Sequence, residues 1–349
     1  MSTLQLGSKT VGDGNPTYII AEIGINHQGD VKIARELIHQ AALAGADAVK
    51  FQKRNVDRIL TRDGLEMPYD NPNSFGKTYG EHKRALELTE GDYHELLSFA
   101  NEMNVDFTAS GWDEESIDFL DTLGIDFFKM ASADLTNFPL LEHTAKKGRP
   151  MILSTGMADL EMVKQAYQLV RSYNPKIALL QCTSTYPSRF NEINLRVLET
   201  FRMAFPEAVI GYSGHELGIA ISEVAVAMGA KIVERHFTLD RTMKGGDHAA
   251  SLEPGGLQKL IRDIRHIEDA LGTGEKRIQE SEAPYFKKLA KSVVSTMPIP
   301  QGTIITRDML TTKGPGTGIS PARIGDVVGK SPKVDLKGDV VIREDDIEW

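Results

Sequence analysis

Short apolar runs alternate with amphipathic segments from about residue 17 to residue 272. Most of these runs are almost continuously apolar, which is typical of parallel strands that helices cover. The intervening segments repeat apolar residues every three or four positions, as Val31–Ala44 does, and this spacing predicts helices. Eight runs are predicted to be strands: Thr17–Gly24, Asp47–Gln52, Asp106–Gly111, Phe127–Ser132, Pro150–Thr155, Ile177–Thr183, Ala208–Ser213 and Lys231–Phe237.

The number and spacing of these units favour one fold. Eight strand–helix units over about 255 residues match a (β/α)8 TIM barrel in number and size. A doubly wound open sheet is the alternative, but it rarely needs eight evenly spaced units, and no GxGxxG sequence follows the first run. We therefore expect an α/β protein whose residues 1–272 form a TIM barrel.

The character of the sequence changes after residue 272. Residues 273–285 are rich in charged residues, include Gly274 and Pro284, and are predicted to be a linker. Short β-like pieces separated by turn residues follow, such as Ser292–Thr296 and Gly314–Gly318. Residues 286–349 are therefore expected to form a small second domain that is only marginally stable alone.

Composition narrows the class of protein. Hydrophobic residues make up 41% of the chain, but no apolar stretch reaches the ~18 residues of a membrane span. The first residues lack a signal-peptide pattern, and the single cysteine, Cys182, allows no intrachain disulfide, so a cytoplasmic protein is expected. Cys182 lies within an apolar run and is expected to be a core residue. The net charge of −9 argues against general nucleic-acid binding.

The segment Lys53–Gly91 is too long for a tight connection between a strand and a helix. Long segments of this kind in compact domains are usually functional or disordered. Because this one is rich in aromatic, glycine and basic residues, we expect it to be functional.

Two histidines, His215 and His236, each follow or end an apolar run. If both runs are neighbouring parallel strands, the imidazoles meet at the same edge of the sheet. Neighbouring strands lie ~4.8 Å apart, so one divalent metal ion could bind both rings.

Polar side chains also collect at the ends of the other predicted strands, where barrels carry their chemistry. Lysines there can neutralise a phosphate or carboxylate, serines can donate hydrogen bonds to it, and carboxylates can act as acid, base or metal ligand. Such a site suits addition to a carbonyl, by condensation or by a metal-dependent isomerisation or aldol step. The residues are Glu22, Lys50, Gln52, Ser110, Lys129, Ser132, Asp134, Ser154, Ser184, Tyr186, Ser213, Glu234 and Asp247.

Several of these residues lie in segments that resemble the sialic acid synthase family, and most of all its animal-type enzymes. The segments are Ala21–Gly29, Lys50–Gln52, Phe107–Gly111, Ile152–Met157, Gln181–Pro187, Gly211–His215 and Glu234–His236. In addition, Ile299–Leu310 resembles the antifreeze-like (SAF) domain that these synthases carry.

The resemblance implies a reaction, a cofactor and an assembly. The family condenses phosphoenolpyruvate with N-acetylmannosamine, or with its 6-phosphate, to give a nine-carbon 2-keto sugar acid and phosphate. A divalent metal, typically Mn²⁺ with Mg²⁺ or Co²⁺ as alternatives, activates the aldehyde. The family is a homodimer in which each small domain lies over the partner's barrel.

The resemblance also implies roles for individual residues. His215 and His236 match metal ligands, and Glu22 and Glu234 match carboxylates near the chemistry whose roles it does not separate. Residues that match the phosphoenolpyruvate site are Lys50, Ser110, Lys129, Ser132, Ser154 and Ser213. Residues that match the sugar site are Gln52, Asp134, Ser184, Tyr186 and Asp247.

Some positions depart from the bacterial pattern for the free sugar. Gly314 stands where those enzymes carry an arginine, Ser184 replaces an asparagine, and Asp134 replaces a glutamate. These departures favour the 6-phosphate as acceptor. The long segment contains four residues that could supply positive charge for this phosphate: Lys77, His82, Lys83 and Arg84. The alternative is that they form the basic, solvent-exposed start of a helix.

Other functions stay open at this point. Related synthases make legionaminic, pseudaminic or deaminated sugar acids. A metal-dependent sugar isomerase on the same fold would work without phosphoenolpyruvate. The tail alone could act as an ice- or carbohydrate-binding module, which would not need the lysines of the barrel rim.

Overall fold

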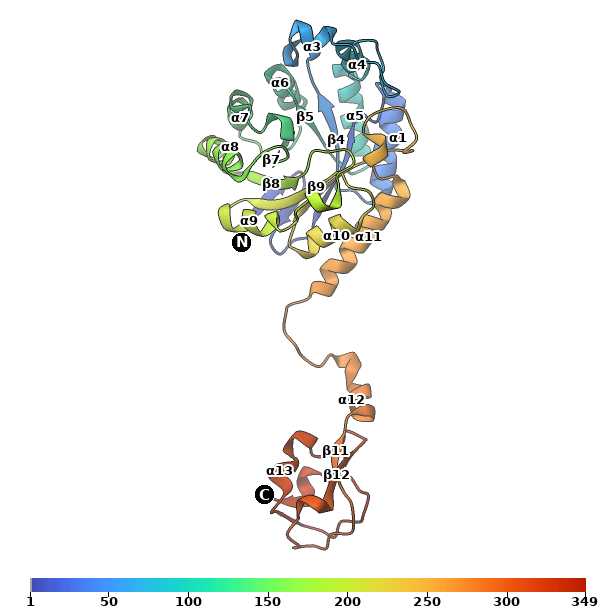
Figure 1. Ribbon diagram of the computed structural model, residues 1–349, viewed down its shortest axis with the longest axis vertical. Helices are drawn as coiled ribbons and strands as arrows, with labels where there is room; N and C mark the ends of the chain where they lie inside the picture. Colours follow the sequence, from blue (N-terminus) through green and yellow to red (C-terminus); the bar gives the residue numbers. More distant parts are fainter. Residues whose placement is uncertain (1) are drawn as a thin grey trace. The chain divides into compact units, whose positions relative to one another are not determined.

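The computed structural model describes residues 2–349, which divide into two compact units, one that ends at Gly272 and one from Thr273 to Trp349 (Figure 1). The first unit is built around an eight-stranded parallel sheet. Its strands are β3 (Tyr18–Gly24), β4 (Ala48–Lys53), β5 (Asp106–Gly111), β6 (Phe128–Met130), β7 (Met151–Ser154), β8 (Ile177–Cys182), β9 (Val209–Gly214) and β10 (Ile232–His236).

The sheet is a nearly closed barrel. The paired strands run in the order β5-β4-β3-β10-β9-β8-β7-β6, so β3 pairs with β10 and the ends of the row are β5 and β6. Across that seam the Thr108 hydroxyl donates a hydrogen bond of 2.7 Å to the carbonyl of Phe127. The predicted fold, an eight-stranded TIM-like barrel followed by a small domain, is confirmed, and the open-sheet alternative is wrong.

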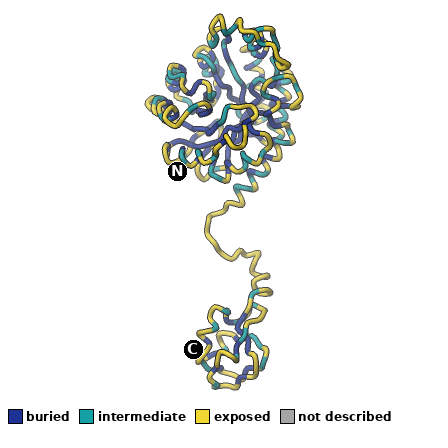
Figure 2. Tube along the Cα trace, in the orientation of Figure 1, coloured by how far each residue is buried: buried dark blue, intermediate teal, exposed yellow. Residues whose placement is uncertain are grey.

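Helices surround the strands, as Figure 1 shows, and Figure 2 shows the buried strands inside a largely exposed outer ring. Outward side chains such as Ile19, Ala21 and Ile23 pack against these helices in one large core. The helices are α1 (Val31–Ala44), α5 (Glu90–Glu102), α6 (Glu114–Leu123), α7 (Phe138–Ala145), α8 (Leu160–Tyr173), α9 (Val197–Ala204), α10 (Ala220–Ala227) and α11 (Pro254–Leu271).

The inward face of the strands changes character along the barrel. At the amino ends of the strands the inward residues are apolar, and Tyr18, Ile20 and Ile232 belong to an inner hydrophobic cluster. Two residues further along the same face, the strands carry Glu22 and Glu234. Because side chains in a strand alternate between faces, one row of each strand contributes both to the core and to the rim.

An antiparallel hairpin, β1 (Thr3–Leu6) and β2 (Lys9–Gly12), covers the amino end of the barrel. This hairpin was not among the strands predicted from the sequence. Its side chains Leu4, Leu6 and Val11 are buried in the inner cluster, together with residues from the first positions of the barrel strands. The hairpin therefore closes the end of the barrel opposite the polar rim.

The long connection after β4 is structured and contains three short helices. They are α2 (Val56–Ile59), α3 (Arg62–Glu66) and α4 (Tyr79–Ala85). Helix α4 begins with a capping box in which the Thr78 side chain accepts from the backbone of Glu81 and the Glu81 side chain accepts from the backbone of Thr78.

The second unit has a hydrophobic core of its own that includes Val293, Ile305 and Leu310. The predicted linker, residues 273–285, is mostly irregular, but a helix begins at Ala283. The elements are α12 (Ala283–Leu289), β11 (Ser292–Ser295), β12 (Leu310–Lys313), α13 (Ile324–Val327), β13 (Ser331–Pro332) and β14 (Ile347–Glu348). Among residues 2–349, no helix has the length and apolar character needed to cross a membrane.

Candidate active site

A cavity of about 210 Å³ lies at the carboxyl ends of the barrel strands. Most of the predicted site residues line it, and they lie on the barrel strands or in the segments just beyond their carboxyl ends. They are Glu22, Lys50, Gln52, Ser110, Lys129, Ser132, Ser154, Ser184, Tyr186, Ser213, His215, Glu234 and His236. Trp112, Ala131, Ala133, Met157 and Cys182 complete the lining.

Strand register explains why these side chains meet. Glu22 pairs with Lys50 on one neighbouring strand and with His236 on the other. Glu234 pairs with Ser213, and it shares the inward face of β10 with His236 because the two are two residues apart. The parallel register therefore brings Glu22, Lys50 and His236 to one level of the barrel, and it places Glu234 two residues earlier on the same inward face.

Two lysines and two glutamates form a buried ionic cluster on the cavity floor. The ammonium of Lys50 lies 2.6 Å from Glu22 and 3.9 Å from Glu234, and Lys129 lies 3.3 Å from Glu234. The Ser110 hydroxyl accepts a hydrogen bond of 3.2 Å from Lys50. The formal charges of the cluster cancel before any ligand enters.

The two glutamates nevertheless differ in acidity. Burial raises the pKa of Glu22, and Lys50 offsets this only in part. Burial also acts to raise the pKa of Glu234, but Lys129 and Lys50 outweigh it and lower that pKa overall. Two carboxyl groups with opposite pKa shifts suit different tasks, with Glu22 able to carry a proton and Glu234 remaining ionised. Protonation of Glu22 would leave a net positive charge in the cavity, which favours an anionic ligand.

The serines offer further hydrogen bonds. The hydroxyl oxygen of Ser154 is buried and has no hydrogen-bond partner among residues 2–349. The hydroxyl of Ser132 accepts a hydrogen bond of 3.0 Å from the backbone N–H of Gly156. A Cβ atom at Gly156 would come within 2.1 Å of the Ser184 hydroxyl, so glycine lets this loop approach the cavity closely.

His215 and His236 lie side by side, with ring centroids 5.2 Å apart. The Nδ1 atom of His215 lies 2.9 Å from the Thr183 carbonyl, which fixes the proton on Nδ1 and leaves a lone pair on Nε2. The Nδ1 atom of His236 is buried without a hydrogen-bond partner in the described part of the chain. Burial and the neighbouring His215 hold the pKa of His236 well below its usual value, so this ring is neutral.

This donor set fits a divalent metal ion that is only partly held by protein. Two imidazoles face each other, Asp247 lies 3.8 Å from Nδ1 of His236, and no cluster of three or more His, Cys, Asp or Glu ligands occurs within residues 2–349. A metal bound by two histidines would keep coordination positions free for water and substrate, as catalytic sites require. Tyr186 borders both rings, at 4.1 Å from His215 and 5.5 Å from His236 between centroids.

Comparison with known proteins identifies the family. A model described as the NeuB family matches residues 37–276, which is more than half of the chain. The chain belongs to the NeuB family. A second model, described as the SAF domain, matches residues 290–348. The NeuB barrel and the SAF domain thus occur in the order that the sequence resemblance implies.

Relatives of this NeuB-family chain match it over almost all of its length. Human N-acetylneuraminate-9-phosphate synthase is 51% identical over 96% of this chain and 94% of its own. The N,N'-diacetyllegionaminic acid synthase of Legionella pneumophila is 38% identical over 98% of both chains. A crystal structure of N-acetylneuraminic acid (sialic acid) synthetase from Leptospira borgpetersenii, in complex with citrate, has a TM-score of 0.71 and 34% identity, covering 81% of this chain and 96% of that one.

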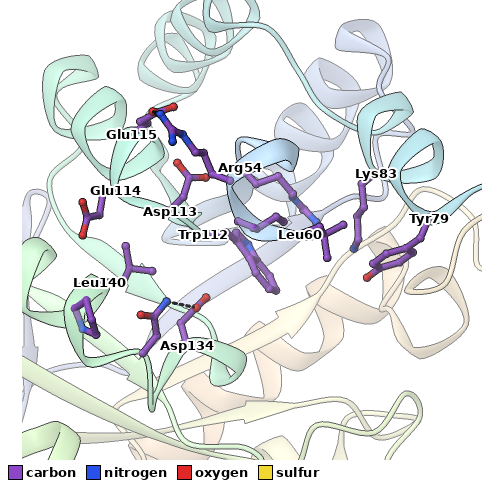
Figure 3. Close-up of a pocket in the computed structure, with 14 residues that line it drawn as sticks. Arg54, Leu60, Tyr79, Lys83, Trp112, Asp113, Glu114, Glu115, Asp134 and Leu140 are labelled. Carbon is purple, nitrogen blue, oxygen red and sulfur yellow. Dashed lines mark hydrogen bonds and ion pairs between the residues drawn. The ribbon is translucent and has the colours of Figure 1, made fainter. Parts of the chain in front are cut away.

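The remaining predicted residues of the NeuB-family chain lie outside the small cavity. Asp134 lines a larger cavity of about 690 Å³ beside it (Figure 3), and Lys83 lines the same cavity. Arg84 forms an ion pair with Asp57, and Lys77 is exposed and lines neither of the two cavities. The basic loop residues are therefore not one cluster, and only Lys83 faces this larger cavity.

A buried ion pair behind the two histidines was missed by the sequence analysis. Arg235 and Glu216, each adjacent in sequence to one of the histidines, are 2.9 Å apart with no exposed side-chain surface. Arg235 also donates to the carbonyls of Glu216 and Gly218, at 2.6 and 2.8 Å. The pair thereby ties together the two strand ends that carry His215 and His236. Alternation on β10 could have signalled it, because Arg235 must face away from a cavity that its neighbours face.

Cys182 combines two environments. It is buried, as expected for a core residue, but it also lines the cavity at the carboxyl ends of the strands. Its sulfur lies 3.9 Å from Nδ1 of His215 and 3.6 Å from the Ser132 hydroxyl. This thiol therefore helps to shape the cavity wall of the NeuB-family site.

Proposed function

We propose that this protein is a sialic acid synthase that condenses phosphoenolpyruvate with an N-acylated mannosamine, with N-acetylmannosamine 6-phosphate as the preferred acceptor. The observation that carries the proposal is the cavity in which two buried lysines, and a Ser154 hydroxyl without a partner among residues 2–349, adjoin a pair of histidines. The 51% identity with the human N-acetylneuraminate-9-phosphate synthase supports the choice of acceptor.

The reaction joins the two substrates through one new carbon–carbon bond. Carbon 3 of phosphoenolpyruvate attacks the aldehyde carbon of the open-chain sugar, and the aldehyde oxygen takes up a proton. Water adds to carbon 2 of the phosphoenolpyruvate unit. The bond between this carbon and the bridging oxygen then breaks, which releases inorganic phosphate and leaves a nine-carbon 2-keto acid.

The residues of the cavity divide this work by their charge. Lys50 and Lys129 bind the phosphate and carboxylate of phosphoenolpyruvate, and Ser154 donates a hydrogen bond to the same anion. Glu22, whose pKa is raised by burial, can transfer protons at the reacting carbons and oxygens. Glu234 stays ionised and holds both lysines in place, since it contacts each of them.

His215 and His236 would hold the divalent metal ion, with Mn²⁺ expected before Mg²⁺ or Co²⁺, and the metal would supply Lewis-acid polarisation of the aldehyde. Tyr186 borders both rings and orients the sugar. Gln52 donates to Glu22 at 3.0 Å and extends toward the sugar side of the cavity. Asp247, at 3.8 Å from His236, completes the polar surface on that side.

The assembly and location that the resemblance implies belong to the same proposal. We expect a homodimer in which the small domain serves the partner's barrel, and light scattering of the purified protein tests the mass. The small domain's match to the SAF model supports this expectation. We also expect a cytoplasmic location, which the presence of a single cysteine supports.

One assay separates this proposal from its nearest alternatives. Phosphate release from phosphoenolpyruvate is measured with N-acetylmannosamine, its 6-phosphate, mannose 6-phosphate and the acceptor of the legionaminic acid enzymes, with and without Mn²⁺. The greatest kcat/KM is expected with N-acetylmannosamine 6-phosphate. Turnover with none of these acceptors overturns the synthase, while a preference for another acceptor overturns only the choice of sugar.

A further inference from the structure

The larger cavity of about 690 Å³ opens next to the catalytic cavity, and the indole of Trp112 lines both. Figure 3 shows Lys83 and Tyr79 together at one end of it, with Asp134 across the cavity. The Nε1 atom of Trp112 is buried and has no hydrogen-bond partner in the described part of the chain. The larger cavity and the catalytic cavity are therefore neighbours that share Trp112 in their walls.

Arg54 is a fixed cation in this wall. Only 3% of its surface is exposed, and its guanidinium contacts Glu87 at 2.7 Å through Nε and donates to the Gln52 side chain at 2.5 Å through Nη2. The group lies over the ring of Trp112, 5.2 Å from its centroid. No hydrogen bond occupies Nη1 within residues 2–349, so one donor group of a rigid guanidinium stays available for a ligand.

Lys83 is a second cation in the same wall, and it has no carboxylate within ion-pair distance among the described residues. Its ammonium lies 5.1 Å from the centroid of the Tyr79 ring. Burial and the charge of Arg54 lower the pKa of Lys83 to about 8. Two cations that destabilise each other in a partly buried wall favour an anion between them.

Acidic residues also line this cavity and limit where an anion can bind. Glu115 is paired with Arg58 at 2.5 Å, and Asp113 accepts hydrogen bonds from Asn55 and from the Ser116 hydroxyl. In Figure 3 these carboxylates lie toward the end of the cavity away from Lys83. An anionic group is therefore expected at the end formed by Arg54 and Lys83.

A chain of hydrogen bonds connects this end with the catalytic carboxylate. Gln52 donates to Glu22 at 3.0 Å with its amide nitrogen and accepts from Arg54 at 2.5 Å with its amide oxygen. Only one side-chain amide thus separates Glu22 from the guanidinium. An open-chain hexose whose aldehyde lies at the histidine pair can extend along Gln52 toward the second cavity.

We propose that Arg54 and Lys83 bind the phosphate at the far end of the acceptor sugar, an inference that rests on the proposed function. They form a recognition site for a phosphate monoester that is separate from the lysines that hold phosphoenolpyruvate. Arg54 offers the free edge of its guanidinium and Lys83 its unpaired ammonium. The basic residues expected from the sequence to hold this phosphate were Lys77, His82, Lys83 and Arg84, and Arg54 was not among them.

The test compares two acceptors in one variant. Lys83→Met removes the charge and keeps the length of the side chain. We expect it to lower kcat/KM for N-acetylmannosamine 6-phosphate by about 10- to 100-fold, the usual value of a hydrogen bond to a charged group, and to change kcat/KM for free N-acetylmannosamine by less than threefold. The KM for phosphoenolpyruvate should not change. Lys83→Arg keeps the charge and should keep most of the preference for the 6-phosphate.

Controls keep the outcomes distinct. Lys164→Met removes an exposed lysine of α8 that lines neither cavity and should behave as wild type. Lys83→Gln replaces Lys83→Met if thermal melting shows that the latter is unfolded. Equal losses with both acceptors, or no loss with either, would overturn the phosphate site while leaving the synthase standing. If the wild-type protein releases no phosphate from phosphoenolpyruvate with any acceptor, the proposed function itself is wrong, and this inference with it.

Discussion

Glu216→Gln is expected to destabilise the barrel and to reduce turnover, although it alters no group in the cavity. The substitution preserves the size of the side chain and an oxygen that can accept from Arg235, but it removes the negative charge. Arg235 then remains as a cation with no exposed surface and no other carboxylate within ion-pair distance among residues 2–349. Loss of one partner of a buried ion pair costs about 3–5 kcal/mol.

Three observations place the effect toward the lower end of this range. The backbone carbonyls of Glu216 and Gly218 still accept from Arg235, at 2.6 and 2.8 Å. The glutamine can still bond the Tyr212 hydroxyl, which donates to Glu216 at 2.7 Å. We therefore expect a loss of about 3 kcal/mol, which for a barrel of this size lowers the Tm by about 6–12 °C.

The assay is urea unfolding followed by circular dichroism, together with turnover measured well below the Tm. Tyr212→Phe is the matched control, since it removes one hydrogen bond to the same carboxylate but leaves the ion pair, and it should cost about 1.5 kcal/mol, the lower end for a hydrogen bond to a charged group. The double variant Glu216→Leu with Arg235→Met should be more stable than Glu216→Gln, because no charge is left unpaired. A loss in Glu216→Gln no greater than that in Tyr212→Phe would refute this account of the pair.

Three further predictions concern the hairpin, a buried histidine and the metal pair. Leu6→Ala should cost about 3 kcal/mol in urea unfolding, because Leu6 is fully buried in the inner cluster; a change below 1 kcal/mol would show that the hairpin does not close the barrel. Burial lowers the pKa of His27 to about 4, so the unfolded chain takes up a proton at this residue first, and the free energy of unfolding falls as the pH drops below about 6.5. Between pH 7.5 and pH 5 the wild-type protein should therefore lose about 2 kcal/mol more of this free energy than His27→Gln. Equal losses in the two proteins would contradict this. His236→Ala should lower kcat by about 100-fold or more while the affinity for phosphoenolpyruvate, measured by calorimetry, stays within threefold; unchanged turnover would remove His236 from the mechanism.

The barrel could be predicted because its strands leave a strong pattern. Buried parallel strands such as β8 and β10 are short runs that consist largely of apolar residues. In the helices between the strands, apolar residues recur every three or four positions. The hairpin β1–β2 was missed because each strand has only four residues and its partner core lies on distant strands. Nothing local in Leu4, Leu6 and Val11 shows that they close a barrel.

The convergence of the candidate site residues could be predicted because the topology fixes where strand ends meet. Parallel strands in register place their carboxyl ends at the same end of the barrel. The side chains at these ends therefore converge, as those of Lys50, Lys129, Glu234 and His236 do. The connecting segments carry no such rule. Arg54 lies just beyond β4, and only its contacts with Gln52 and Glu87 give it a place in the cavity wall.

The basic loop illustrates the same limit. Lys83 and Arg84 are neighbours in α4, so the helix directs their side chains differently, one toward the cavity and one toward Asp57. The basic residues of this segment led to the prediction that it binds the phosphate of the acceptor. Only the helix and its capping box determine which of the charges can face the cavity.

The origin of the oxygen in the released phosphate shows whether phosphoenolpyruvate condenses with the sugar through cleavage of its carbon–oxygen bond. Phosphoenolpyruvate labelled with ¹⁸O at the bridging oxygen is incubated with the protein, Mn²⁺ and N-acetylmannosamine 6-phosphate, and the products are analysed by mass spectrometry. We expect phosphate that carries the label, formed only when the acceptor is present and in equal amount with a nine-carbon 2-keto acid. Unlabelled phosphate, or conversion of the sugar without consumption of phosphoenolpyruvate, would contradict it.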